Sequence, residues 1–177
     1  MSPFAGPLFA GAGLLAAAGA LKVVRPVPAT RALQAAGLGR WSAGARALGL
    51  VEVAVAAAAL SIGGRVTAAL VASSYVGFAL FVVRLRRRAG SQADCGCFGA
   101  SATPVTGVHV VVNLGLALGG AASVAWPSPG VLRVMAQTPL AGLPFLGFTA
   151  LLGWLALITL TLVPDLAVAA SGGAVRR

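Results

Sequence analysis

The sequence is poor in charged residues and in the side chains that most active sites use. Only 9% of its 177 residues are charged, and it has three acidic residues, one histidine and two cysteines. A soluble domain has roughly 25% charged residues, so this composition excludes an ordinary water-soluble fold. With one histidine, two cysteines and no paired cysteine spacing, no metal site is predicted.

Apolar residues dominate what remains. Hydrophobic residues make up 59% of the chain and the mean hydropathy is +0.96, which indicates an integral membrane protein. The net charge of +10 could indicate a nucleic-acid partner, but the basic residues stand at the ends of apolar runs instead of along one face. We therefore expect a lipid bilayer, and no nucleic acid, as the partner of this surface.

Five apolar stretches approach the length of about 20 residues that a helix needs to cross a bilayer. They are residues 3–21, 47–64, 66–83, 104–126 and 143–163. Because backbone groups in lipid must be hydrogen-bonded within their own segment, the predicted fold is an all-α integral membrane protein. A short surface helix is expected at about 29–39, and Gly63-Gly64 predicts a tight turn between antiparallel neighbours. Gly115 and Gly119 give the fourth span a face for close helix contact.

The basic residues are distributed unevenly between the ends of these spans. If the N-terminus lies outside, eleven basic residues fall on the inner side and two, Arg65 and Arg133, on the outer side. Positive loops stay in the cytoplasm, so this bias predicts a multi-pass protein with residues 84–103 inside. The first span has no basic region before it, which favours a membrane helix over a cleavable signal peptide.

The two cysteines form the motif Cys95-Gly96-Cys97 in the polar loop before the fourth span. A disulfide across one glycine closes a small, strained ring, and strained exposed disulfides exchange readily. Positive charge stabilises the thiolate that attacks in such exchange, and a basic cluster precedes the motif, namely Arg84, Arg86, Arg87 and Arg88. Membrane topology alone also explains this cluster, and the two roles are compatible.

A second group of polar residues lies inside the predicted spans. Glu52 is their only acid, and His109 and Asn113 lie one turn apart on the fourth span. An ionisable side chain within a span costs roughly 2.5–3.5 kcal/mol, so Glu52 needs a partner. Glu52 and His109 are expected at similar depths from the inner side. They would form either a proton relay or quinone-facing pocket that serves the dithiol, or an interhelical hydrogen bond from Glu52 to His109 or Asn113.

The motifs of this chain are Asp94-Cys95-Gly96-Cys97-Phe98-Gly99, Leu50-Val51-Glu52-Val53, Asn113 and Ala18-Gly19-Ala20-Leu21-Lys22. Together they resemble the MauE family of methylamine-utilisation membrane proteins, within the wider DoxX-like group. The resemblance implies a four-helix membrane core over residues 1–126, and a loop, a fifth membrane helix and a short basic tail over 127–177. It also implies a bacterial inner-membrane protein in thiol–disulfide traffic that matures exported proteins, such as the small subunit of methylamine dehydrogenase, beside a thioredoxin-like partner.

The sequence therefore predicts a membrane protein that passes electrons through a dithiol, to or from a thioredoxin-like protein or a larger membrane redox complex. Its candidate catalytic residues are Cys95, Cys97, Glu52 and His109, and its candidate cofactor-binding residues are Asn113, Arg84 and Arg86. A quinone is the one candidate cofactor. The alternative is a non-catalytic accessory subunit whose Gly- and Ala-rich helix faces pack against a larger membrane complex.

Overall fold

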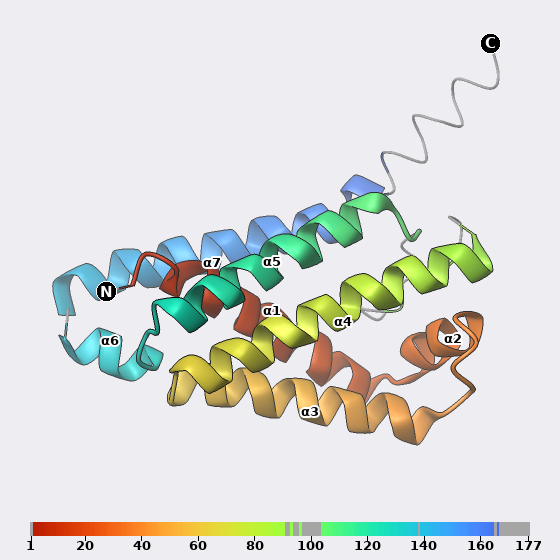
Figure 1. The fold of residues 1–177 in the computed structure, drawn as a ribbon, viewed down its shortest axis with the longest axis horizontal. Coiled ribbons are helices and arrows are strands. Elements are labelled where there is room, and N and C mark those ends of the chain that lie inside the picture. Colours follow the sequence, from red (N-terminus) through yellow and green to blue (C-terminus); the bar gives the residue numbers. More distant parts are fainter. Residues whose placement is uncertain are drawn as a thin grey trace, which may run out of the picture.

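The computed structural model describes residues 2–90, 93, 96, 104–137, 139–164 and 166. The described part of the chain forms seven α-helices and no strand, apart from an isolated bridge between Gly63 and Pro129 (Figure 1). The helices are α1 (Ala5–Val24), α2 (Val27–Ala35), α3 (Ser42–Ser61), α4 (Arg65–Ala89), α5 (Gly107–Ala125), α6 (Val131–Gln137) and α7 (Pro139–Thr161).

Five of these helices are long and apolar enough to cross a membrane: α1, α3, α4, α5 and α7. The prediction of an all-α membrane protein with five spans is thereby confirmed. The helix ends differ from the predicted ones, most of all in α4, which continues from the predicted end at 83 through the arginine cluster to Ala89. Basic side chains favour the C-terminal end of a helix, and α4 stops only at Gly90, whose φ is +80°.

α1 is the central helix of the bundle. It packs against α3 on one side and α7 on another, while α4 and α5 pack along each other (Figure 1). The core between them is built from apolar side chains such as Leu8, Phe9, Leu15 and Val71. Tyr75 of α4 crosses this core and donates a hydrogen bond of 2.6 Å to the carbonyl oxygen of Gly11. A polar tether thus joins α4 to the central helix.

The two ends of the bundle differ in what closes them (Figure 1). We call them the α2 end, which also holds the C-terminal ends of α1 and α4 and the starts of α3 and α5, and the α6 end. At the α2 end, Arg84 Nε donates a hydrogen bond of 2.8 Å to the carbonyl oxygen of Ala36, just after α2. The predicted surface helix at 29–39 is α2, which begins two residues earlier.

Backbone hydrogen bonds close the α6 end. Gly63 and Gly64 make the predicted turn between α3 and α4, with φ values of +69° and +91°. Gly64 N donates to Ser128 O at 2.9 Å, and Gly130 N donates to Ile62 O at 3.2 Å. These bonds tie the α3–α4 turn to the connection between α5 and α6.

The predicted glycine face of α5 is only half correct. Gly119 does approach another helix closely, because a Cβ there would lie 2.9 Å from Pro7 Cβ. At Gly115 a Cβ would meet nothing within 4 Å, whereas at the neighbouring Gly120 it would lie 3.0 Å from Ala72 Cβ. The close contacts of α5 therefore follow Gly119 and Gly120, since α1 and α4 approach it from two directions.

Candidate functional site

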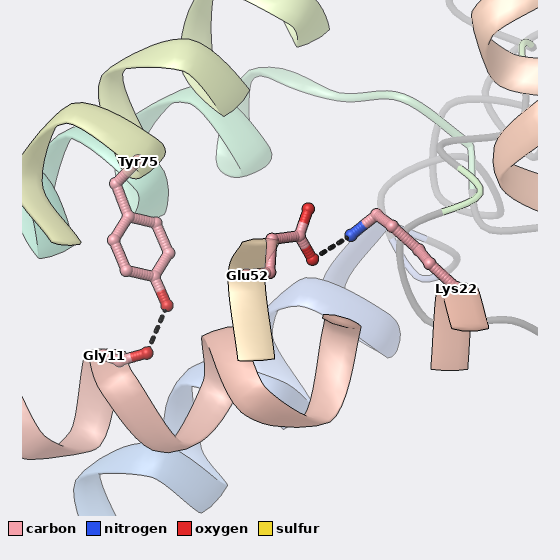
Figure 2. A network of polar contacts seen from close by, with 4 residues as sticks. All are labelled: Gly11, Lys22, Glu52 and Tyr75. Carbon is pink, nitrogen blue, oxygen red and sulfur yellow. Dashed lines mark hydrogen bonds and ion pairs between the residues drawn. The ribbon is translucent and has the colours of Figure 1, made fainter. Parts of the chain in front are cut away.

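A buried ion pair links α1 to α3. Lys22 Nζ lies 2.7 Å from Glu52 Oε2, and the side chains are only 7% and 2% exposed (Figure 2). The ammonium also lies 5.2 Å from the centre of the Phe78 ring on α4, within reach of a cation–π contact. The acid inside the second span is thus compensated by the only lysine of the chain.

Two glycines bring α1 and α3 close enough for this pair. A Cβ on Gly19 would lie 2.6 Å from Gly49 O, and a Cβ on Gly49 would lie 2.6 Å from Gly19 O. The same Cβ atoms would also stand 2.9 Å from the Cβ atoms of Glu52 and Lys22, respectively. The glycine contact and the ion pair are therefore parts of one helix crossing.

One carboxylate oxygen of Glu52 has no partner within the described part of the chain. Oε1 is buried and makes no hydrogen bond to any described residue, whereas Oε2 is held by Lys22. Figure 2 shows the two oxygens pointing apart, with only one directed at the ammonium. A buried carboxylate oxygen normally has a hydrogen-bond donor, so this atom marks a place for one.

The start of α5 fixes the position of His109. Thr106 is the N-cap, and its backbone N–H donates to His109 Nδ1 at 3.3 Å in a capping box, so α5 begins at Gly107 instead of near Pro104 as predicted. Because Nδ1 accepts, the proton of the neutral ring is assigned to Nε2. One turn later, Asn113 Nδ2 donates to His109 O at 2.6 Å.

The ion pair of α1 and α3 and the polar residues of α5 line one cavity of about 380 Å³ near the α2 end of the bundle. Its polar lining includes Lys22, Glu52, His109 and Asn113, and most of the remaining lining is apolar. Glu52 lies ten residues after Ser42, where α3 begins, or about 15 Å along the helix axis. The predicted span begins at residue 47, so Glu52 lies deeper from the start of its helix than the sequence indicates, yet Glu52 and His109 line the same cavity.

Gly96 also lines this cavity and is buried. Its φ is +65°, and a Cβ there would lie 2.6 Å from Pro28 O and 3.1 Å from Ala32 Cβ, both on α2. Only glycine suits both the left-handed backbone and the close contact. The residue between the two cysteines is thus packed against α2 in the wall of the cavity.

The structure brings together three of the predicted site residues, Glu52, His109 and Asn113, around the cavity. The expected hydrogen bond from Glu52 to His109 or Asn113 is wrong, because Glu52 bonds Lys22 and His109 bonds Thr106. Arg84 bonds Ala36 O, Arg86 lies beside Gly107, and neither lines the cavity. Cys95 and Cys97 lie outside the described residues.

Sequence reasoning missed the role of Lys22. From the sequence, Lys22 is one of eleven basic residues expected on the inner side and the last residue of a family motif, and no role at the site is predicted for it. A signal was present, since Lys22 is the one lysine among twelve arginines and stands at the end of an apolar span. A lysine carries a compact charge on a flexible stem, and here the stem brings Nζ from the end of α1 to Glu52.

Comparison with known proteins places this chain in a family. No curated protein and no solved structure matches the chain closely enough to count as similar. The sequence model of one family, described as methylamine utilisation protein MauE, matches residues 3–127. The match spans α1 to α5 and leaves out α6 and α7. Since it covers well over half of the chain, this multi-pass membrane protein belongs to the MauE family.

Proposed function

We propose that this protein is a membrane thiol–disulfide redox protein whose working groups are Cys95 and Cys97. The observation that carries the proposal is Gly96, the residue between them, which is buried against α2 and lines the cavity that holds Lys22 and Glu52. Gly96 has a backbone conformation that only glycine adopts easily, so it fixes the middle of the Cys-Gly-Cys motif at the wall of the cavity. Membership of the MauE family supports the same reading.

The chemistry is thiol–disulfide exchange. A thiolate of a thioredoxin-like partner attacks the disulfide between Cys95 and Cys97, one of these two cysteines leaves as a thiolate, and the second partner thiolate then attacks the mixed disulfide. The partner leaves with a disulfide, and Cys95 and Cys97 remain as a dithiol. Four arginines at the C-terminal end of α4 supply positive charge that favours the thiolate form. In this role the protein would support the maturation of disulfide-containing or cofactor-containing partners.

An accessory role without thiol chemistry is the second candidate. α7 lies outside the family match, and only 11% of its most apolar window is buried within the chain. That open apolar face could pack against a larger membrane complex. The two candidates differ in whether the cysteines are required.

Replacing Cys95, Cys97 or both with serine should abolish the maturation of the partner while leaving membrane insertion and abundance unchanged. Alkylation and mass spectrometry of the purified protein, with and without reductant, should show a pair of thiols that appears only after reduction. Ser61→Ala, at the α6 end, serves as a control substitution. Full maturation activity in the double serine variant would overturn the redox function and favour the accessory role.

We also propose an orientation, with the N-terminus outside and the α2 end in the cytoplasm. The positive-inside bias supports it, since Arg65 and Arg133 are the two basic residues assigned to the other side. The positions of the basic residues along the helices agree with this orientation. The start of α3 lies between Arg40 and Arg46, at the inner end, and α3 ends near Arg65, at the outer end.

The two exposed ends of α3 allow a matched test of this orientation. In a Cys95→Ser, Cys97→Ser background, Ser61→Cys should react with a membrane-impermeant maleimide in intact cells, and Ser42→Cys should react only after permeabilisation. Both serines are exposed and both changes are nearly isosteric. If Ser42→Cys is labelled in intact cells and Ser61→Cys is not, the protein has the opposite orientation.

A further inference from the structure

The cavity has the size and chemistry of a ligand site. Its volume of about 380 Å³ falls within the range of about 300–1,000 Å³ that small-molecule pockets occupy. Most of its wall is apolar, and its polar groups are few and specific, as in sites that orient a ligand by its head. The polar atoms of the cavity therefore determine which head group it accepts.

The polar side chains Glu52 and Lys22 in the cavity lining can bind a ligand that both donates and accepts hydrogen bonds. Glu52 Oε1 is buried and without a partner among the described residues, so it would accept a hydrogen bond from a ligand. Lys22 has three N–H donors, one of which Glu52 Oε2 occupies. A second N–H could donate to a ligand oxygen. A ligand with a carbonyl oxygen that becomes a hydroxyl satisfies both requirements in its two states.

The exposed residues that line the cavity are apolar. Leu38, Leu48 and Val51 line it and are 52%, 40% and 58% exposed, respectively. Leu48 and Val51 lie on the membrane-spanning helix α3, where exposed leucine and valine face lipid hydrocarbon. A ligand would therefore enter from the bilayer, which selects a lipid-soluble molecule.

We infer that the cavity binds the head group of a lipid-soluble quinone, which acts as electron acceptor for the dithiol; this inference rests on the proposed function. In the step, the two S–H bonds of Cys95 and Cys97 break and one S–S bond forms. The quinone takes up the two electrons and two protons, and its two carbonyl oxygens become hydroxyls. Lys22 donates to the quinone oxygen, and Glu52 accepts from the hydroxyl of the quinol. Both residues position the ring.

Quinone binding is tested with the full-length protein in nanodiscs of quinone-free phospholipid, with decylubiquinone as the probe. The reduced protein should consume one equivalent of quinone, read as the loss of quinone absorbance. The Cys95→Ser, Cys97→Ser variant should bind the probe with an unchanged Kd and consume none. Absence of saturable binding to the native protein would overturn the inference.

Two variants place the probe in this cavity. Ala18→Leu adds a side chain to the buried wall of the cavity and should weaken binding by at least tenfold, whereas Ala17→Leu, on the exposed side of the same turn, should change it less than twofold. Glu52→Gln keeps the shape of the side chain and should weaken binding of the reduced probe by about tenfold. Circular dichroism checks that each variant is folded. Weaker binding in either Ala18→Leu or Glu52→Gln is enough to place the probe in the cavity. Unchanged binding in both would overturn the assignment.

Three further outcomes separate the possible explanations. Farnesol carries a hydroxyl and an apolar chain but no redox ring, so displacement of the probe by an equal concentration of farnesol would assign the cavity to a lipid alcohol and overturn the quinone. If the serine variants lose partner maturation while the native protein binds no quinone, this inference fails and the proposed function stands. If quinone binds but the serine variants mature the partner normally, the proposed function fails and the binding site stands.

Discussion

Replacing Lys22 with methionine should lower the free energy of unfolding by about 3–5 kcal/mol, the usual cost of removing one partner of a buried ion pair. The change leaves the carboxylate of Glu52, which is 2% exposed, without its ammonium. Methionine preserves the length of the side chain, so the loss reports on charge more than on packing. The measurement is the loss of helical circular dichroism of the purified protein as SDS is added to mixed micelles.

A double variant separates the pair from each partner alone. Lys22→Met with Glu52→Leu should regain most of the stability, because a buried ion pair is often replaced by apolar residues at little cost. Arg46→Met removes an exposed basic residue of α3 and should change stability by less than about 0.5 kcal/mol. A double variant as unstable as Lys22→Met would show that packing, and not the uncompensated charge, accounts for the loss.

Gly19→Ala and Gly49→Ala should each destabilise the bundle by about 1–3 kcal/mol, the range for an overpacked contact. Each new Cβ would lie 2.6 Å from a backbone carbonyl oxygen, which cannot rotate away, so α1 and α3 must separate. The same SDS titration measures the effect, and a separation of the helices should also weaken the Lys22–Glu52 pair.

Gly13→Ala, on α1 like Gly19, is the matched control. A Cβ there would meet nothing within 4 Å, and alanine is favoured over glycine in a helix by up to about 1 kcal/mol. This variant should therefore be as stable as the native protein or slightly more stable. Equal effects at Gly13 and Gly19 would contradict the close crossing of α1 and α3.

The long helices were predictable because each depends on local composition. An apolar stretch of membrane length must be helical whatever it packs against, and two adjacent glycines favour a turn wherever they occur. The ends were less predictable, since α4 continues through charged residues that a hydropathy criterion excludes. The start of α5 depends on the side chains of Thr106 and His109, whose capping box hydropathy does not detect.

The candidate site was predictable in its members but not in their pairing. Glu52, His109 and Asn113 were identified because polar groups within a span are costly, a rule that holds for each residue alone. The partner of Glu52 comes from another helix, 30 residues away, and depends on how closely two glycines let the helices cross. No periodicity or spacing within one span contains that information.

The helix that carries the cation of the buried pair precedes the helix that carries its acid in the chain. α3 has the lowest hydropathy of the five membrane helices and carries the buried acid, so on its own it would enter the bilayer at an added cost of roughly 2.5–3.5 kcal/mol. α1 leaves the ribosome first, and Lys22 in its last turn lies near the membrane surface, where its charge can reach water. The ammonium of Lys22 is therefore already in the membrane when α3 is inserted. Before the pair forms, α1 is stable in the bilayer without its partner, whereas α3 is not.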